Sequence, residues 1–308
     1  MKTFFVTLNW NTTGFFKKML ESVDATARGS HTWVIVDNGS YDNERRDLVR
    51  YCADRFKGRF ALYGEDRAGW GDPGNMVADC VLITLPFNIG CVLGHNLSLE
   101  MCAALAGDDA YDVVLMNTDI EVYHEGWLPE VQAYARKHNA GIVGMEHSAA
   151  ELCAGAVFLD TQGYWYLHKA QLMAKKPVRG ESVGMGLALL RWPVPTLRFD
   201  EGYRMYYKQD DDLCFQVRAN LGLDIVAYPV DMIHWGNRAI RGNDYVLDDE
   251  VRDKESFEAM KRENQRYFAK KWAWALRGRR KGMAEEGRHL AEMDTLMRER
   301  RLDSGLSY

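Results

Sequence analysis

The sequence of 308 residues lacks several features that would point to whole classes of protein. Its longest apolar runs have the length of a strand, so none could cross a bilayer. There is no internal repeat and no low-complexity tract. The six cysteines form no C-x-x-C pair and mostly lie in apolar contexts, which favours buried, reduced thiols in a cytosolic protein. A net charge of −5 disfavours wholesale nucleic-acid binding.

The opening residues, MKTFFVTLNWN, are too short and too polar for a signal peptide and predict a first β-strand. Apolar, β-branched segments then alternate with segments of helical periodicity. Such alternation predicts an α/β fold of Rossmann type, with three layers around a mostly parallel sheet. The predicted strands are Thr3–Leu8, Thr32–Val36, Val81–Leu85, Val113–Met116 and Gly141–Met145, and the predicted helices are Phe15–Val23, Asn43–Phe56, Val92–Ala106 and Trp127–His138.

After about residue 150 the predicted elements become shorter, and the last part of the chain is helical and strongly charged. We predict one catalytic domain over residues 1–252 and a helical C-terminal extension over residues 253–308. The shorter elements are strands at Ala156–Leu159, Tyr164–Leu167, within GMGLALLRW and at Asp224–Tyr228, and a helix at Asp211–Asn220.

Polar residues follow four of the predicted strands. The segments are NWN (9–11), DNGS (37–40), FNIG (87–90) and NTDIE (117–121). One such segment is typical of an ordinary turn or helix cap. Because the carboxyl ends of parallel strands meet at one edge of a sheet, four together indicate a lined binding site.

This site is not a dinucleotide-binding loop, since NIGCVLGHN lacks G-x-G-x-x-G and the chain has no G-x-x-x-x-G-K-[ST]. A phosphate group would therefore need side chains and a metal ion. NTDIE offers oxygen ligands suited to Mg²⁺ or Mn²⁺. His234, which follows a late strand, could be a further ligand favouring Mn²⁺, although a lone histidine is more often structural.

An ordered series of segments resembles the family-two nucleotide-sugar glycosyltransferases, which invert the anomeric carbon and have the GT-A fold. TLNWN resembles the family's TxYN, and VDNGSYDN its VDNxSxD. FNIGCVLGHNLSLE, LMNTDIEV and GMGLALLRW are similar to later family segments, and LMNTDIEV corresponds to the D-x-D. FDEGYRMYYKQDDDLCFQVRANLGLDIVAYPVDMIHWG and NQRYFAKKW complete the series.

Two positions depart from the family pattern. Asn117 replaces the first acidic residue of the D-x-D, whereas Asp119 is kept. Gln209 replaces the acidic residue before Asp210. The Q-x-x-R-W signature of processive synthases is absent, so the chain is most similar to single-transfer enzymes of the rhamnosyltransferase type.

The resemblance implies a role for each matching residue, with a donor half at about residues 1–121 and an acceptor half at about 122–252. Asp210 would be the general base, and Asp119 and His234 would hold Mn²⁺ or Mg²⁺ on the diphosphate. Residues of the donor pocket would be Asn9, Trp10, Asn11, Asp37, Asn88, Asn96, Asn117 and Asp119, with Asp37 on the nucleobase. Residues of the acceptor side would be Gly184, Gly186, Arg191 and Asp212.

The three consecutive aspartates, Asp210–Asp212, have two explanations. They precede an apolar helical pattern, where acidic residues stabilise a helix by about 0.3–1 kcal/mol each. Capping explains one or two carboxylates better than three, since like charges repel. Inverting transfer needs one carboxylate as base. We expect Asp210 to be this base, Asp211 to be solvated, and Asp212 to cap the helix or bind a backbone amide near the acceptor.

Two other functions remain open at this stage. GESVG (180–184) matches the nucleophile elbow of serine hydrolases, with Asp210 and His234 following in the expected order. The elbow must join a strand to a helix, whereas a strand-like run follows it here. The amides at Asn117 and Gln209 would also suit a non-catalytic module that binds nucleotide sugars or glycans.

The expected partners are a UDP-, GDP- or TDP-linked sugar donor and a glycan or another hydroxyl-bearing acceptor. The basic, aromatic segment Lys261–Gly282 has two interpretations. It is either a helix that packs its aromatic residues on the catalytic domain or a surface for anionic lipid or polyanion. We expect a cytoplasmic location, with peripheral membrane contact in the second case.

Overall fold

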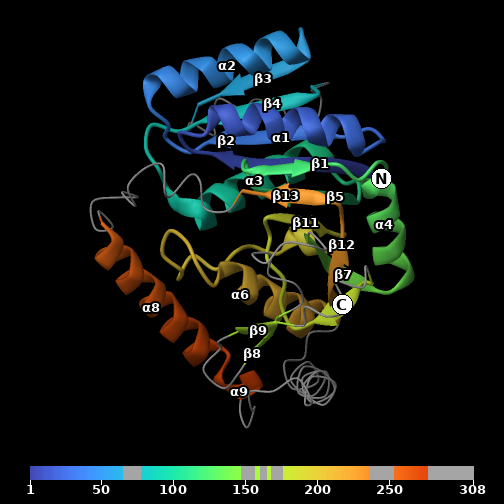
Figure 1. The fold of residues 1–308 in the computed structure, drawn as a ribbon, viewed down its shortest axis with the longest axis vertical. Coiled ribbons are helices and arrows are strands. Elements are labelled where there is room, and N and C mark those ends of the chain that lie inside the picture. Colours follow the sequence, from blue (N-terminus) through green and yellow to red (C-terminus); the bar gives the residue numbers. More distant parts are fainter. Residues whose placement is uncertain (65–77, 147–156, 160–164, 168–175, 236–252, 277–308) are drawn as a thin grey trace.

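The computed structural model of the chain describes residues 1–64, 78–146, 157–159, 165–167, 176–235 and 253–276 (Figure 1). Its main elements follow in chain order. They are β1 (Lys2–Asn9), α1 (Thr13–Thr26), β2 (Thr32–Asp37), α2 (Asp42–Phe56), β3 (Phe60–Tyr63), β4 (Cys80–Thr84), α3 (Gly90–Ala106), β5 (Tyr111–Met116), β6 (Ile120–Val122), α4 (Trp127–Lys137), β7 (Ala140–Glu146), β8 (Val157–Leu159), β9 (Trp165–Leu167), β10 (Val178–Gly180), β11 (Leu187–Leu190), α6 (Gln209–Gln216), β12 (Asp224–Pro229), β13 (Met232–His234), α8 (Lys254–Lys271) and α9 (Ala273–Leu276).

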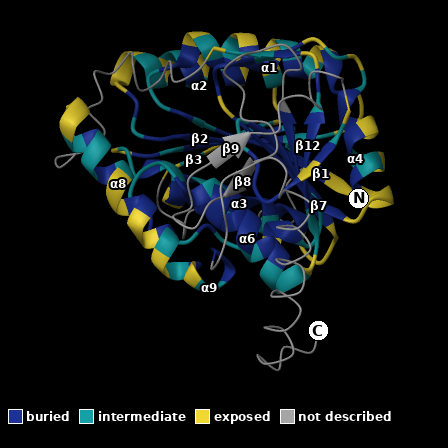
Figure 2. Cartoon of the chain, turned by 60° about the horizontal axis from the view of Figure 1, so that its bottom comes forward, coloured by how far each residue is buried: buried dark blue, intermediate teal, exposed yellow. Residues whose placement is uncertain are grey.

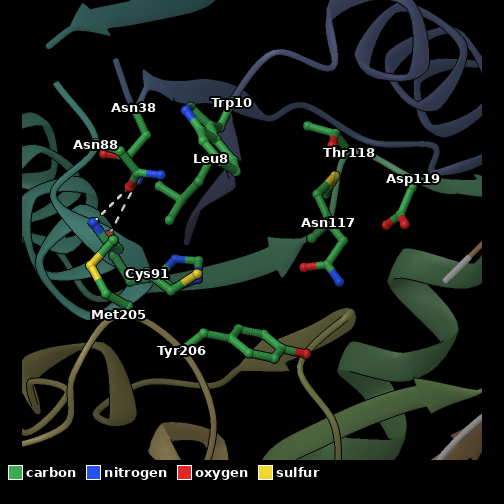
Figure 3. A pocket seen from close by; sticks show the side chains of 13 residues that line it. Leu8, Trp10, Asn38, Asn88, Cys91, Asn117, Thr118, Asp119, Met205 and Tyr206 are labelled. Carbon is green, nitrogen blue, oxygen red and sulfur yellow. Dashed lines mark hydrogen bonds between the residues drawn. The ribbon is translucent and has the colours of Figure 1, made fainter. Parts of the chain in front are cut away.

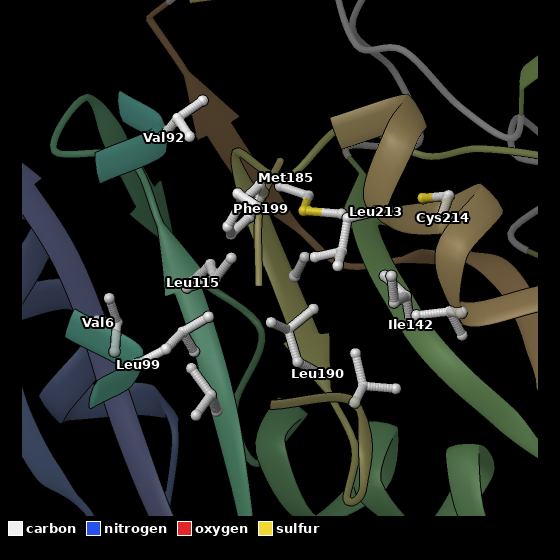
Figure 4. Packing of buried hydrophobic residues seen from close by; sticks show 14 of the residues in the cluster. Val6, Val92, Leu99, Leu115, Ile142, Met185, Leu190, Phe199, Leu213 and Cys214 are labelled. Atoms are coloured by element: carbon white, nitrogen blue, oxygen red, sulfur yellow. The ribbon is translucent and has the colours of Figure 1, made fainter. Parts of the chain in front are cut away.

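A nine-stranded sheet forms the centre, in the order β10-β12-β7-β11-β5-β1-β2-β4-β3. Its strands are apolar on both faces because helices cover both faces. In β1, for example, Phe4 and Val6 pack with α3 and α6 on one side (Figure 4), and Phe5 packs with α1, α2 and α4 on the other. The expected three-layer α/β fold is thus confirmed.

Strand direction places the polar strand ends at one edge. β1, β2, β4 and β5 are mutually parallel, and Asn9 pairs in register with Asp37. β11 is antiparallel to β5, so its first residues reach the same edge. There the Asn117 amide donates to the carbonyl oxygen of Gly186 at 2.8 Å.

A separate two-stranded ribbon crosses this edge. β6 directly follows the Asn117–Asp119 segment and pairs antiparallel with β13, so that His234 lies opposite Ile120. The Trp235 amide extends the ribbon by donating to the Asp119 carbonyl oxygen at 2.9 Å. The ribbon therefore brings His234 to Asp119 across more than a hundred residues of chain.

The predicted strands and helices are all present, with ends that differ by a few residues. The predicted helix over residues 211–220 is divided into α6 and a π-helical turn at Val217–Leu221. The strands β3, β6, β10 and β13 were not predicted. They have three or four residues each, so periodicity alone does not identify them.

The C-terminal helices α8 and α9 pack beside α6, and α8 exposes its outer face (Figures 1 and 2). Phe268 and Trp272 are buried and contact Phe215 of α6, with ring centroids 5.3 and 5.2 Å away. Among the described helices, none combines the length and the apolar composition of a membrane span.

Candidate active site

A cleft of about 820 Å³, including its open mouth, lies at the carboxyl edge of the sheet (Figure 3). Leu8 and Trp10 line it from the end of β1, and Asn117–Asp119 line it from the end of β5. The Tyr206 ring forms the opposite wall, with its hydroxyl directed toward the Asn117 side (Figure 3). The other lining residues are Asn38, Asn88, Gly90, Cys91, His95, Met116 and Met205.

Asn9 and Asp37 lie beneath this cleft as a fully buried pair. The Asn9 amide group donates to Asp37 at 3.1 Å and to the Ser40 hydroxyl at 3.2 Å. Burial raises the pKa of Asp37, and its hydrogen bonds with Ser40 and Asn9 oppose the shift. Asn11, in a left-handed conformation with φ 53°, accepts from the Tyr41 amide at 2.7 Å. Asn9, Asn11 and Asp37 thus hold the two strand ends together.

The next residue, Asn38, lines the cleft in place of Asp37. Its amide group donates to the Asn88 side chain at 2.9 Å, and its oxygen accepts from the Ile89 amide at 2.9 Å. Asn88 accepts in turn from the Gly90 amide at 2.8 Å. This pair of asparagines fixes the turn into α3, whose first residues form one side of the cleft.

Asp119, His234 and Asn117 come together at the other side. Nε2 of His234 lies 3.3 Å from Oδ1 of Asp119 and 3.4 Å from Nδ2 of Asn117. Gly186 makes room for the imidazole, because a Cβ atom there would lie 3.2 Å from Cε1 of His234. The predicted pair of metal ligands is therefore adjacent in space.

Asp210, in the first turn of α6, reaches the segment that leads into β11. Its carboxylate accepts from the Met185 amide at 3.2 Å, and Met185 directly precedes the Gly186 that borders His234. Burial, and after it the charge of Asp211, raise the pKa of Asp210 to about 7. The hydrogen bond from the Met185 amide and the charge of Lys208 lower this pKa by less. Burial, and to a smaller extent the charge of Asp210, raise the pKa values of Cys91 and Tyr206, which line the cleft.

The expectation that Asp211 is solvated was wrong. Its side chain is 4% exposed and accepts from Lys208 at 2.7 Å and from the Ser182 hydroxyl. The Lys208 ammonium is itself fully buried, so the two charges compensate each other.

Asp212 lies away from the cleft and is fully buried between α6 and the C-terminal helices. Its oxygens accept from the Tyr203 hydroxyl at 3.0 Å, the Trp272 indole at 2.6 Å, the Gln216 amide at 2.7 Å and the Lys271 ammonium at 2.8 Å. Among the described residues, no side chain makes a capping hydrogen bond at α6. The predicted capping role of Asp212 was wrong. Asp212 instead joins α6 to the C-terminal helices through the Trp272 indole and the Lys271 ammonium.

Three further predicted residues are not brought to the cleft wall. Asn96 is buried in α3 and pairs with the backbone of Phe199 at 2.8 and 3.0 Å. Arg191 follows β11 at the opposite edge of the sheet, where its Nε donates to the Ala140 carbonyl oxygen at 2.6 Å. Gly184 lies just before Met185 in the lead to β11.

Two exposed aromatic residues flank the Asp119–His234 pair. The Tyr123 hydroxyl donates to one oxygen of Glu121 at 2.7 Å, and the Trp235 indole donates to the other at 3.0 Å. Their exposures are 54% for Tyr123 and 42% for Trp235. Glu121 thus orients two aromatic rings instead of pointing into the cleft.

Several cleft residues were not singled out from the sequence. Asn38, Cys91 and His95 lie inside segments that had been recognised, but the side chain facing the ligand could not be chosen without the turn geometry. Met205 and Tyr206 belong to no predicted element. Their signals were the run of aromatic residues before the aspartates and their place in the family-like segment FDEGYRMYYKQDDD.

No protein-family model and no curated protein sequence matches the chain. Solved structures with a similar arrangement include residues 1–349 of TarS from S. aureus, at 11% identity and a TM-score of 0.46 over 99% of this chain and 83% of that one. Its complex with UDP-GlcNAc is 10% identical, with a TM-score of 0.46 over 96% of this chain and 80% of that one. The mannosyltransferase PcManGT from Pyrobaculum calidifontis, in complex with GDP-Man and Mn²⁺, is 12% identical, with a TM-score of 0.47 over 98% of this chain and 86% of that one.

At these scores the function must be inferred from the chain's own residues. Within the described parts, no group of three or more histidine, cysteine, aspartate or glutamate side chains could hold a metal. Asp119 and His234 still suit a cation that takes its other ligands from a diphosphate and water. The space that Gly186 leaves beside the imidazole is consistent with such a site.

The geometry at GESVG does not support a nucleophile elbow. Ser182 is fully buried and its hydroxyl donates to Asp211. The chain then leads into the strand β11, whereas an elbow requires a helix after the serine.

Proposed function

We propose that the protein transfers one sugar from a nucleoside-diphosphate donor to a hydroxyl-bearing acceptor, with inversion and with the help of a divalent cation. The observation that supports this best is the gathering of Asp119, His234 and Asp210 around Met185–Gly186, beside an open cleft. Residues 1–121 would form most of the donor side, and residues 122–252 the acceptor side.

The donor would lie in the cleft, with its base and ribose near Trp10 and Asn38 and its diphosphate near Asn117 and Asp119. Aromatic and amide groups suit these parts of a nucleotide, since Trp10 offers a flat apolar face and Asn38 hydrogen-bonding groups. Asp37 would act on the base indirectly, through the strand ends that it holds together. UDP-, GDP- and TDP-linked donors are all compatible with this lining.

Asp210 would take the proton of the acceptor hydroxyl as its oxygen attacks the anomeric carbon. A carboxylate with a pKa of about 7 is well matched to this task near neutral pH. Inversion in one step needs no covalent sugar intermediate. Mn²⁺ or Mg²⁺ held by Asp119 and His234 would neutralise charge on the leaving diphosphate.

The acceptor would approach beside Tyr123 and Trp235. Both rings are held by Glu121, so stacking a sugar on them would cost little side-chain entropy. We propose a glycan as the acceptor on this basis.

Release of nucleoside diphosphate from a panel that includes UDP-GlcNAc and GDP-mannose tests the function, with Mn²⁺, with Mg²⁺ and with chelator. We expect cation-dependent release with one donor and faster release when its acceptor is added. Binding without release under every condition would instead identify a non-catalytic nucleotide-sugar module. Product stereochemistry by NMR tests inversion.

A further inference from the structure

The cleft wall opposite the strand ends is a short segment, residues 204–208, with an unusual backbone. Met205, Tyr207 and Lys208 have φ angles of 43°, 90° and 72°, in the left-handed region that side chains disfavour. Such residues cost about 1–3 kcal/mol each and persist where the surroundings hold them. The segment carries Tyr206 in the cleft wall and leads directly to Asp210.

One side chain of α8 binds this backbone at four points. Asn264 is 2% exposed, and its Nδ2 lies 2.8 Å from the carbonyl oxygens of Arg204 and Tyr206 and 3.2 Å from that of Tyr207. Its Oδ1 accepts from the Arg204 amide at 3.0 Å. An asparagine serves here because it both donates and accepts over a short reach.

The same helix also packs against the cleft wall. Phe257 and Met260 of α8 form a small apolar cluster with Trp10, Met205 and Tyr206, three residues of the cleft. The rings of Phe257 and Tyr206 are stacked, with centroids 6.3 Å apart and planes at 18°. The C-terminal helix therefore supports the cleft wall from behind.

The C-terminal end of α8 is bound to α6 and to the loop that precedes it. Lys271 pairs with Asp200 at 2.5 Å and with Asp212 at 2.8 Å, and the Trp272 indole donates to Asp212. The described part of the basic segment Lys261–Gly282 thus uses aromatic rings and the cations Lys261 and Lys271 for packing. Its residues 277–282 lie outside the described part of the chain, and membrane contact stays a prediction.

We propose that α8 is a positioning element of the active site, in which Asn264 holds residues 204–208 and so sets the places of Tyr206 and Asp210. The catalytic part of this inference depends on the proposed function. The structural part of the inference is independent of the proposed function, because the position of the cleft wall can be probed through the reactivity of Cys91. The Cys91 amide donates to the Met205 carbonyl oxygen at 2.8 Å, and Cys91 lines the cleft together with Met205 and Tyr206 of the held segment.

The test compares Asn264→Ala with Leu276→Ala. Leu276 is a fully buried residue of α9 that belongs to the large core cluster, and it is neither a cleft residue nor a member of the apolar cluster behind residues 204–208. The two variants are compared well below their melting temperatures, so that a general loss of stability affects both. Alkylation of Cys91 by iodoacetamide, located by mass spectrometry, reports on the wall without any need for activity.

We expect Cys91 to be alkylated at least about tenfold faster in Asn264→Ala than in the wild type, and at nearly the wild-type rate in Leu276→Ala. Equal rates in the two variants would overturn the positioning role. With an active donor, Asn264→Ala should lower kcat by about tenfold or more, while Leu276→Ala should keep the wild-type kcat. If Cys91 is alkylated no faster in Asn264→Ala than in the wild type, the positioning role is refuted and the proposed function is not affected. If the wild type shows no turnover, the proposed function is refuted and the positioning role is not affected.

Discussion

Replacing Asp210 by asparagine should make the protein more stable as well as inactive. The raised pKa of this carboxyl, about 7 against an ordinary 3.8, means that the folded state binds its proton more tightly than the unfolded state. Stability therefore falls as the pH rises between these two values, because the unfolded state loses the proton first. Asparagine has no such proton, and its oxygen can still accept from the Met185 amide.

The size of the effect follows from the shift. A difference of about three pKa units corresponds to ~4 kcal/mol of destabilisation of the wild type above neutral pH. Asp210 is partly exposed, so water lowers this figure, which is an upper bound. From about pH 5 to about pH 8, the stability gap between Asp210→Asn and the wild type should widen by roughly 2–3 kcal/mol at most.

Urea unfolding at the two pH values measures the gap, with Asp54→Asn on the exposed face of α2 as a control for removing a carboxylate. The kinetic counterpart is a value of kcat/KM that falls about tenfold per pH unit below about pH 7 in the wild type. A gap that stays constant from the lower to the higher pH would contradict the raised pKa and remove the physical basis for Asp210 as the base.

Three other substitutions test separate parts of the site. Asp119→Ala should weaken cation-dependent nucleotide binding by about tenfold or more while binding with chelator stays the same, measured by calorimetry; an equal loss under both conditions would exclude a cation on Asp119. Gly186→Ala places a Cβ atom 3.2 Å from His234 and should raise the Mn²⁺ concentration needed for half-maximal release; an unchanged requirement would refute this role of Gly186. Asp212→Ala removes the acceptor of the buried Trp272 indole and leaves Lys271 with Asp200 alone, and should cost about 3–5 kcal/mol of unfolding free energy; a loss below about 1 kcal/mol would contradict a structural anchor.

The position of the site was predictable because strand ends follow from strand periodicity and strand direction. Once the alternation predicted parallel strands, Asn9, Asp37, Asn88 and Asn117 had to lie at one edge of the sheet. The turn after each strand then decides which residue faces the ligand. At the end of β2 that residue is Asn38, since Asp37 points down to Asn9.

Contacts between distant segments could not be predicted in the same way. Asn264 meets residues 204–207 from about sixty residues further along the chain, and Lys271 meets Asp212 from a similar separation. Nothing in the local pattern of either segment specifies the other. The same limit applies to Arg191, whose strand runs antiparallel and so carries it to the opposite edge.

The three consecutive aspartates show how one local pattern can supply three different environments. Successive residues of a helix point about 100° apart, so Asp210, Asp211 and Asp212 face three different neighbours. Lys208 pairs with Asp211 and Lys271 pairs with Asp212, and each pair compensates a buried charge. Asp210 instead meets the Met185 amide and the negative charge of Asp211, which together with burial makes its proton the one that titrates near neutral pH. A base can therefore arise from a run of acidic residues because the fold supplies cations to its neighbours.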